Sequence, residues 1–192
     1  MIKHSLLTLV IACAAVAPSP VLAESHVEPV NEYFQSEVFP WLSDPVLIDA
    51  VREQNARYAD LTPADIEKLD LEWRAQVTLM SKPLVDAVLE RGVSKFLAEK
   101  QEDSKGMITE IFLMDAKGLN VGQSEVTSDY WQGDEAKWQR TFGAGTGEVF
   151  VDRVETDEST QALQSQASVV ISDPETGEPI GAITIGINLD KL

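Results

Sequence analysis

A short stretch near the middle of the chain, residues 127–142, carries the side chains best suited to holding a small molecule. Three large aromatic residues, Tyr130, Trp131 and Trp138, lie within nine residues and outside any predicted strand. Ligand pockets combine apolar or aromatic walls with a few placed polar groups, and here those groups are Asp129, Gln132, Asp134 and Lys137. We therefore predict that this segment walls a pocket. The alternative for the two tryptophans is that they fill the core between the segment and a sheet.

Two further polar residues are placed to reach the same pocket from a strand. Gln166 and Ser168 are two positions apart in a predicted strand, so their side chains share one face. If that face lines the pocket, both supply hydrogen bonds. An inward-facing Lys137 favours a ligand with a carboxylate, whereas an inward aspartate favours an amine. The sequence leaves this choice open.

Catalytic motifs are missing from the sequence after residue 23, where His26 is the one remaining histidine. A Ser-His-Asp or Cys-His arrangement therefore does not occur, and neither does a zinc-ligand spacing or a phosphate loop. The glycine-rich run 143–147 does not join a strand to a helix with the spacing of a dinucleotide fingerprint, so it is interpreted as a turn. With 32 acidic residues, carboxylate pairs arise by chance. We expect a non-enzymatic protein without cofactor or metal, and a hydrolase using carboxylates alone is the minor alternative.

The charge of the chain is strongly acidic. It has 15 Lys and Arg against 32 Asp and Glu, a net charge of −17. Such a surface repels phosphate backbones and anionic membranes, so we expect no nucleic-acid partner. The simplest interpretation of the charge is that it keeps the protein in solution.

The N-terminus has the pattern of a cleavable export signal over residues 1–23. Lys3 provides the positive region, residues 5–17 are apolar and uncharged, and small side chains precede the expected cut between Ala23 and Glu24. The predicted compartment is the periplasm or the cell exterior. A membrane anchor is less favoured because prolines interrupt the apolar run, and lipidation of Cys13 is the second alternative. Cleavage removes this single cysteine, so no disulfide is expected.

Residues 24–105 read as helices. Asp44-Pro45 and Thr62-Pro63 are helix starts with a capping side chain before a first-turn proline. A third start at Lys82 either opens a new helix or kinks a long one. The apolar stripe that follows is Leu84, Val88, Val93, Phe96 and Leu97. Trp73 is interpreted as core, with a dimer interface as the alternative.

Residues 106–192 change to strand patterning. Predicted strands cover 107–114, 120–124, 148–154, 162–171 and 179–188, with a loop and a short helix between the second and third. Short turns at 115–118 and 173–177 make neighbouring strands antiparallel. The predicted fold is α+β, with N-terminal helices packed on a five-stranded antiparallel PAS-like sheet, and the helices and sheet form one domain.

This layout resembles the Cache (PDC) family, the PAS-like extracytoplasmic sensor domains of chemoreceptors and histidine kinases. The matching segments are 111–118, with an apolar strand running into Asp-x-x-Gly, the aromatic-polar stretch 127–135, and the final hairpin 168–187. The resemblance implies that Tyr130 and Trp131 contact a ligand and that Asp173 binds a ligand ammonium, although Asp173 is also a typical turn residue before Pro174. It also implies pairing through the N-terminal helix, which makes a homodimer an expectation to test.

Family members usually continue into a membrane helix and a signalling domain, whereas this sequence stops at Leu192. The hypothesis is therefore a periplasmic Cache-like module that binds a small polar metabolite, an organic or amino acid. It would signal through a membrane sensor or transporter partner. The alternative is a structural or interaction protein whose pocket is filled by its own side chains and which modulates a membrane complex.

Overall fold

The structure is a computed structural model that describes residues 25–156 and 162–192. The predicted export signal, with Cys13 and the cleavage position Ala23–Glu24, lies outside these residues. No helix within the described ranges is both long enough and apolar enough to cross a membrane.

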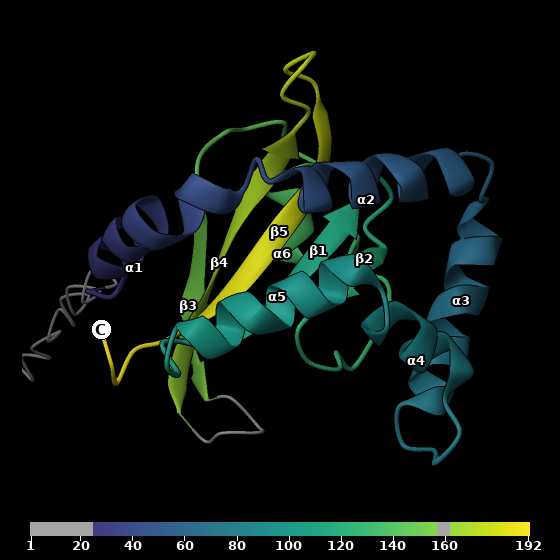
Figure 1. The fold of residues 1–192 in the computed structure, drawn as a ribbon, viewed down its shortest axis with the longest axis horizontal. Coiled ribbons are helices and arrows are strands. Elements are labelled where there is room, and N and C mark those ends of the chain that lie inside the picture. Colours follow the sequence, from purple (N-terminus) through teal and green to yellow (C-terminus); the bar gives the residue numbers. More distant parts are fainter. Residues whose placement is uncertain (1–24, 157–161) are drawn as a thin grey trace, which may run out of the picture.

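Seven helical segments of the described chain precede the sheet (Figure 1). They are α1 (Val27–Tyr33), the π-helical η1 (Phe34–Val38), the 3-10 turn η2 (Phe39–Trp41), α2 (Pro45–Arg57), α3 (Pro63–Gln76), α4 (Pro83–Leu89) and α5 (Gly92–Asp103). The predicted starts of α2 and α3 are confirmed. Asp44 accepts a hydrogen bond from the Val46 amide at 2.9 Å, and Thr62 forms a capping box with Asp65.

The predicted stripe from Leu84 to Leu97 is divided between two helices. Helix α4 ends at Leu89, and Arg91 adopts an extended backbone (φ −60°, ψ 147°) before α5 begins. Lys82 therefore opens a separate helix rather than kinking a long one. The break places Arg91 at the N-cap of α5.

The five predicted strands are confirmed, with ends that differ from the predicted ones by at most two residues. They are β1 (Ile108–Asp115), β2 (Asn120–Gln123), β3 (Phe150–Thr156), β4 (Leu163–Ser172) and β5 (Pro179–Asn188), and the short helix α6 (Ala136–Gln139) lies between β2 and β3. All neighbours pair antiparallel in the order β2-β1-β5-β4-β3. The last strand of the chain thus occupies the centre of the sheet.

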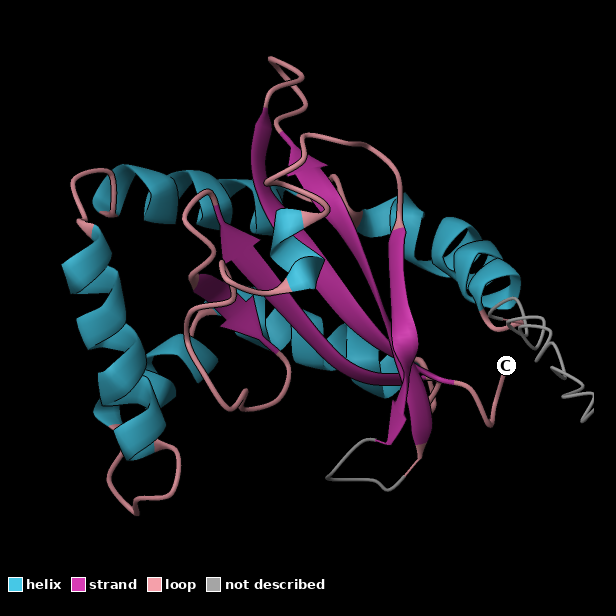
Figure 2. Ribbon diagram, turned by 180° about the vertical axis from the view of Figure 1, so that it is seen from behind, coloured by secondary structure: helices cyan, strands magenta, loops and turns pink. Residues whose placement is uncertain are grey.

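The two faces of the sheet have different coverings. Figure 1 shows α1, α2 and α5 across one face, and Figure 2 shows α6 across the other. On β5, Ile183 and Ile185 face the large helices and pack with Leu47 of α2 and Leu97 of α5. Ala182 faces α6 together with Phe112, Met114, Trp138 and Phe142. This alternation follows from the two-residue period of a strand.

Helices α3 and α4 form a separate hydrophobic cluster at the β2 end of the molecule. Trp73, Val85 and Val88 pack there with Leu119 and Tyr130. Trp73 is fully buried, and its indole N–H donates to the Thr127 carbonyl at 2.9 Å. The prediction that Trp73 is a core residue is confirmed, although it packs against the 127–131 segment.

Candidate ligand-binding site

A cavity of about 720 Å³ lies on the α6 face of the sheet. Strands supply its floor: Thr109, Glu110 and Phe112 from β1, Gln164 and Gln166 from β4, and Glu155 and Thr156 from β3. The segment after β2 supplies its wall, through residues 125–129, Gln132, Glu135 and Lys137, with Val77 beside them. The cavity therefore forms where the predicted pocket segment crosses the open part of the sheet.

Three of the predicted ligand residues line this cavity: Asp129, Lys137 and Gln166. Gln132, which the sequence also favoured, joins them. Asp129 and Lys137 come from the wall segment, whereas Gln166 comes from β4. Residues far apart in sequence thus meet at one site, as the strand-face argument for Gln166 requires.

Lys137 is buried at one side of the cavity, with 9% of its surface exposed. Its Nζ lies 2.9 Å from a carboxylate oxygen of Glu135 and 5.0 Å from the centre of the Phe112 ring. Both contacts stabilise the ammonium. Lys137 therefore already has its counter-charge and adds little positive potential to the cavity.

Asp129 is held firmly in the cavity wall. Its Oδ1 accepts a hydrogen bond from Gln132 Nε2 at 2.5 Å, and its Oδ2 lies 3.3 Å from Arg74 Nη2. Because Arg74 also binds Asp70 at 2.6 Å, one guanidinium is shared by two carboxylates. The wall thus has a fixed shape before any ligand arrives.

The strand side of the cavity is a hydrogen-bonded row. Gln166 Nε2 donates to Glu110 Oε1 at 2.8 Å, and the Thr109 hydroxyl donates to Gln164 Oε1. Thr109 and Glu110 adjoin a register shift of β1 against β5 between Ile108 and Glu110. This irregularity brings two successive polar residues of β1 to the cavity, because a bulge re-aims side chains.

The cavity lining is strongly acidic. Five lining residues are carboxylic acids, Glu110, Glu125, Asp129, Glu135 and Glu155, and Lys137 is the single base. Glu110 comes from β1, Glu155 comes from β3, and the other three acids come from the segment that follows β2. The acids therefore surround the space from several sides. A concave site lined by one sign of charge concentrates counter-ions. The electrostatic potential of this site therefore favours a cation.

Tyr130 and Trp131 do not line the cavity. The Tyr130 ring is fully buried and stacks on Trp73, with ring centres 5.1 Å apart and planes 15° from parallel. The amides of both residues donate to Asp70 Oδ1 at 2.9 and 3.0 Å, and the Trp131 indole donates to the Lys117 carbonyl at 2.8 Å. These aromatics anchor the wall segment to α3 and to the β1–β2 turn.

Trp138, which belongs to α6, and Ser168, which α6 covers, lie beside the cavity. Trp138 packs with Phe142 against the sheet, and its indole N–H donates to the Asp115 carbonyl at 3.2 Å. The hydroxyl of Ser168 lies 2.9 Å from that of Thr184, and both are buried. Ser168 has the predicted face, but α6 covers it. Asp134 is exposed and does not line the cavity.

Asp173 lies in the β4–β5 turn and is held by α2. Arg52 donates to its two carboxylate oxygens at 2.8 and 2.6 Å, and the Glu175 amide donates at 2.8 Å. The Arg52 hydrogen bonds are the main cause that lowers the pKa of Asp173 to about 2. The structure thus places Asp173 in the turn role and away from the cavity.

Most of the acids that line the site were not predicted from the sequence. Glu110 carried the clearest signal, because it is a charged residue inside an apolar strand and shares its face with Phe112. Glu125, Glu135 and Glu155 are unremarkable in a sequence with 32 acids. Across residues 25–156 and 162–192, no three His, Cys, Asp or Glu side chains are grouped to hold a metal ion.

No family model matches the chain, and no curated protein matches it either. Among solved structures, the sensor domain of the V. cholerae histidine kinase DctB aligns with 85% of this chain at 13% identity and a TM-score of 0.49. The ligand-binding domain of the Campylobacter jejuni chemoreceptor Tlp3, in complex with 4-methylisoleucine, aligns with 78% at 13% identity and a TM-score of 0.41. The Pseudomonas aeruginosa amino acid chemoreceptor PctC, in complex with GABA, aligns with 78% at 12% identity and a TM-score of 0.39.

This chain spans 50% of the DctB sensor domain and about 61–62% of the Tlp3 and PctC domains. The first is a sensor domain, and the other two are ligand-binding domains of chemoreceptors. The assignment of fold rests on the strand order β2-β1-β5-β4-β3, with the helices before β1 and the inserted segment between β2 and β3. In the residues that the structure describes, this arrangement is an α+β fold with helices packed on a PAS-like antiparallel sheet, as the sequence predicted.

Proposed function

We propose that the protein is an exported, non-enzymatic sensor module that binds a small polar metabolite in the cavity on the α6 face. The observation that carries this proposal is the cavity itself, because Asp129, Lys137 and Gln166 line it on a PAS-like sheet. Its volume of about 720 Å³ is in the range of small-molecule sites. The lining combines a hydrogen-bonding row with one aromatic ring, Phe112.

The proposed ligand carries an ammonium group. Five lining acids against one lysine give the cavity an excess of negative charge, and Lys137 is already paired with Glu135. A dicarboxylate would meet this excess charge twice. An amino acid or a simple amine would place its ammonium beside Glu110 and Asp129, and an amino acid would present its carboxylate toward Lys137.

A calorimetric titration of the purified chain tests this function. The panel contains neutral amino acids, γ-aminobutyrate, putrescine and succinate. We expect saturable binding of at least one ammonium compound and none of succinate. In Glu110→Gln the charge is lost while the amide oxygen still accepts the bond from Gln166, so the affinity for that compound should fall about tenfold, which corresponds to about 1.4 kcal/mol.

Glu148→Gln is the matched control, because Glu148 is exposed and does not line the cavity. This variant makes the same change of net charge and should leave the affinity unchanged. Equal loss in both variants would mean that the overall charge attracts the ligand without a defined site. Failure of every ammonium compound to bind would overturn the proposed function.

Trp138 and Phe142 give some support to the alternative of an interaction protein whose pocket is filled by its own side chains. These two rings cover the part of the sheet formed by Phe112, Met114 and Ala182. The part beside Glu110 and Gln166 stays open, which favours ligand binding. Capture of a membrane sensor or transporter that is unaffected by any compound of the panel would select the alternative. Capture that changes with the bound compound would support signalling through that partner.

A further inference from the structure

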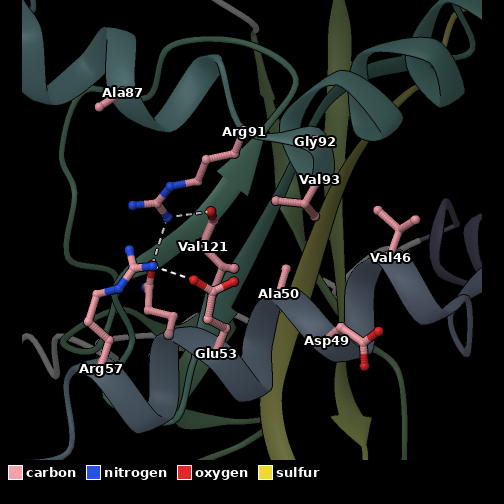
Figure 3. Close-up of a pocket in the computed structure, with 11 residues that line it drawn as sticks. Val46, Asp49, Ala50, Glu53, Arg57, Ala87, Arg91, Gly92, Val93 and Val121 are labelled. Atoms are coloured by element: carbon pink, nitrogen blue, oxygen red, sulfur yellow. Dashed lines mark hydrogen bonds and ion pairs between the residues drawn. The ribbon is translucent and has the colours of Figure 1, made fainter.

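A second cavity, of about 580 Å³, lies on the helical side of the molecule, between α2 and the start of α5 (Figure 3). Its lining is divided along its length. Val46, Ala50 and Val93 give it an apolar stretch, and Arg57 and Arg91 stand at one end (Figure 3). The sheet separates this groove from the cavity on the α6 face, so the two sites are distinct.

The two arginines reach the same end of the groove from different elements. Arg57 belongs to the last turn of α2, and Arg91 precedes α5. In Figure 3 their guanidinium groups point toward one another. Because both residues line the same cavity, an anion within it can accept hydrogen bonds from the two guanidinium groups.

Arg91 is fixed in this position by its inner nitrogen. Nη1 donates to the Gln54 side-chain oxygen and to the Val121 carbonyl, both at 2.7 Å. These two bonds use the hydrogens of one nitrogen, and a guanidinium has five N–H donors in all. The arginine is therefore held in place, and these two bonds use only part of its five donors, although it also lies near the buried Tyr130 hydroxyl.

The N-terminus of α5 adds positive potential at the same point. Arg91 occupies the N-cap, and among the residues that the structure describes no side chain caps this end of the helix. The space beyond the Gly92 Cα is open, since a methyl group at this position would have no neighbouring atom within 4 Å. Unpaired first-turn amides and the helix dipole favour an anion, whereas a cation such as Arg91 is unfavourable there by itself.

Two acids, Asp49 and Glu53, also line the groove. Glu53 pairs with Arg57 across one helical turn, but both side chains are more than half exposed, at 70% and 53%, so the pair is weak and exchangeable. Asp49 stands toward the other end of the groove in Figure 3, and it lies 3.7 Å from Arg52. The end formed by Arg57 and Arg91 thus carries two guanidinium groups and one exposed carboxylate, that of Glu53.

We propose that this groove binds a small aliphatic monocarboxylate. Its carboxylate accepts hydrogen bonds from Arg57 and Arg91 beside the first turn of α5, and its hydrocarbon part lies on Ala50 and Val93. A monoanion fits better than a dianion, because the net negative charge of the chain repels a dianion twice as strongly. The apolar stretch next to the arginines favours a carboxylate with an alkyl group over inorganic phosphate.

The test uses isovalerate as the probe, with isovaleramide as its neutral analogue. Titration is followed by ¹H–¹⁵N NMR on the full chain, so that the site is located as well as detected. We expect the amides of Gly92 and Val93 to shift with isovalerate in a saturable way and to be unaffected by isovaleramide. The dissociation constant should lie near about 1 mM, which is typical of a small fragment with one charged anchor.

Arg57→Gln is the decisive variant, because Arg57 is more than half exposed and its loss spares the fold. It should weaken isovalerate binding about tenfold. Arg153→Gln removes the same charge from an exposed position on β3 and should have no effect. Glu110→Gln should also leave isovalerate binding unchanged, which separates this site from the proposed function.

Three results would overturn the proposal. The first is the absence of saturable shifts at Gly92 and Val93. The second is equal weakening in Arg57→Gln and Arg153→Gln, which would indicate attraction by overall charge. The third is tighter binding of phosphate or succinate than of isovalerate, which would contradict the ligand class.

Discussion

Gln54 donates from its side-chain amide to the buried carboxylate of Asp115 at 2.9 Å. The side-chain oxygen of Gln54, Oε1, accepts a hydrogen bond from Arg91 at 2.7 Å, and only 2% of the Gln54 surface is exposed. One side chain of α2 therefore joins the β1–β2 turn to the residue that starts α5. Burial raises the pKa of Asp115, and the hydrogen bond from Gln54 is the largest of the effects that oppose this rise.

Replacing Gln54 by leucine should destabilise the protein. Gln54→Leu leaves the Asp115 carboxylate and the Arg91 guanidinium each without one partner, and lost hydrogen bonds to charged groups are worth about 1.5–3 kcal/mol. Urea unfolding followed by circular dichroism measures the change. Gln139→Leu is the control, because Gln139 is exposed and its side-chain bond is long, at 3.4 Å. Equal stability of the two variants would contradict a structural role for Gln54.

The ion pair between Arg52 and Asp173 should make stability depend on pH in the acid range. The pKa of Asp173 is lowered to about 2 from an ordinary 3.8. The folded state therefore releases this proton more readily than the unfolded state, so the stabilisation is present above the ordinary pKa and is lost as the pH falls toward 2.

Asp173→Asn checks this dependence. The difference in unfolding free energy between the native chain and the variant should be largest above about pH 5 and should close as the pH approaches 2. Urea titrations at several pH values measure it. A difference that stays constant across this range would show that ionisation of Asp173 does not contribute.

Trp73 should contribute to the fold of the single chain. Trp73→Ala removes the ring that stacks on Tyr130 and the hydrogen bond to Thr127, and loss of a buried tryptophan costs about 3–5 kcal/mol. Leu71→Ala, on the same helix but 60% exposed, should change stability by less than about 0.5 kcal/mol. Sedimentation run in parallel separates the alternative. If Trp73→Ala left stability unchanged and reduced a dimer to monomers, Trp73 would be an interface residue.

Gly118 should tolerate no side chain. Its φ is +82°, and a Cβ there would lie 2.6 Å from backbone atoms of Gly133. Gly118→Ala should therefore destabilise the fold by about 1–2 kcal/mol, because an L residue is strained in the left-handed conformation. The added methyl group should also push the β1–β2 turn away from the wall segment. Gly145→Ala is the matched control, because the φ of Gly145 is also positive, at +64°, and a Cβ there would have no neighbouring atom within 4 Å. Thermal unfolding should show a clearly larger loss for Gly118→Ala, and equal losses would mean that the close approach to Gly133 is unimportant.

The sequence by itself determined the elements and their order. Capping residues such as Asp44 and Thr62 act within one helical turn, and the two-residue alternation of β4 and β5 is equally local. Such signals need no knowledge of distant residues. The prediction that Gln166 and Ser168 share one face of β4 was correct for the same reason, since side chains two residues apart in a strand point the same way.

Only the tertiary structure decided which side chains share a site. In β1, Phe112 and Met114 on one face are as apolar as Ile111 and Leu113 on the other, so hydrophobicity does not say which face meets the wall segment. Tyr130 is buried because its ring stacks on that of Trp73, which is far away in the sequence.

The two groups of charged residues that line the cavities also depend on the tertiary structure. The acids around the α6-face cavity come from separate strands and loops, and Arg57 and Arg91 are 34 positions apart. Their proximity depends on how α2, α5 and the sheet pack, and packing is determined by contacts between residues that local sequence patterns do not relate. The sequence therefore determined that this chain forms helices on a PAS-like sheet, and the tertiary structure decided where its charges converge.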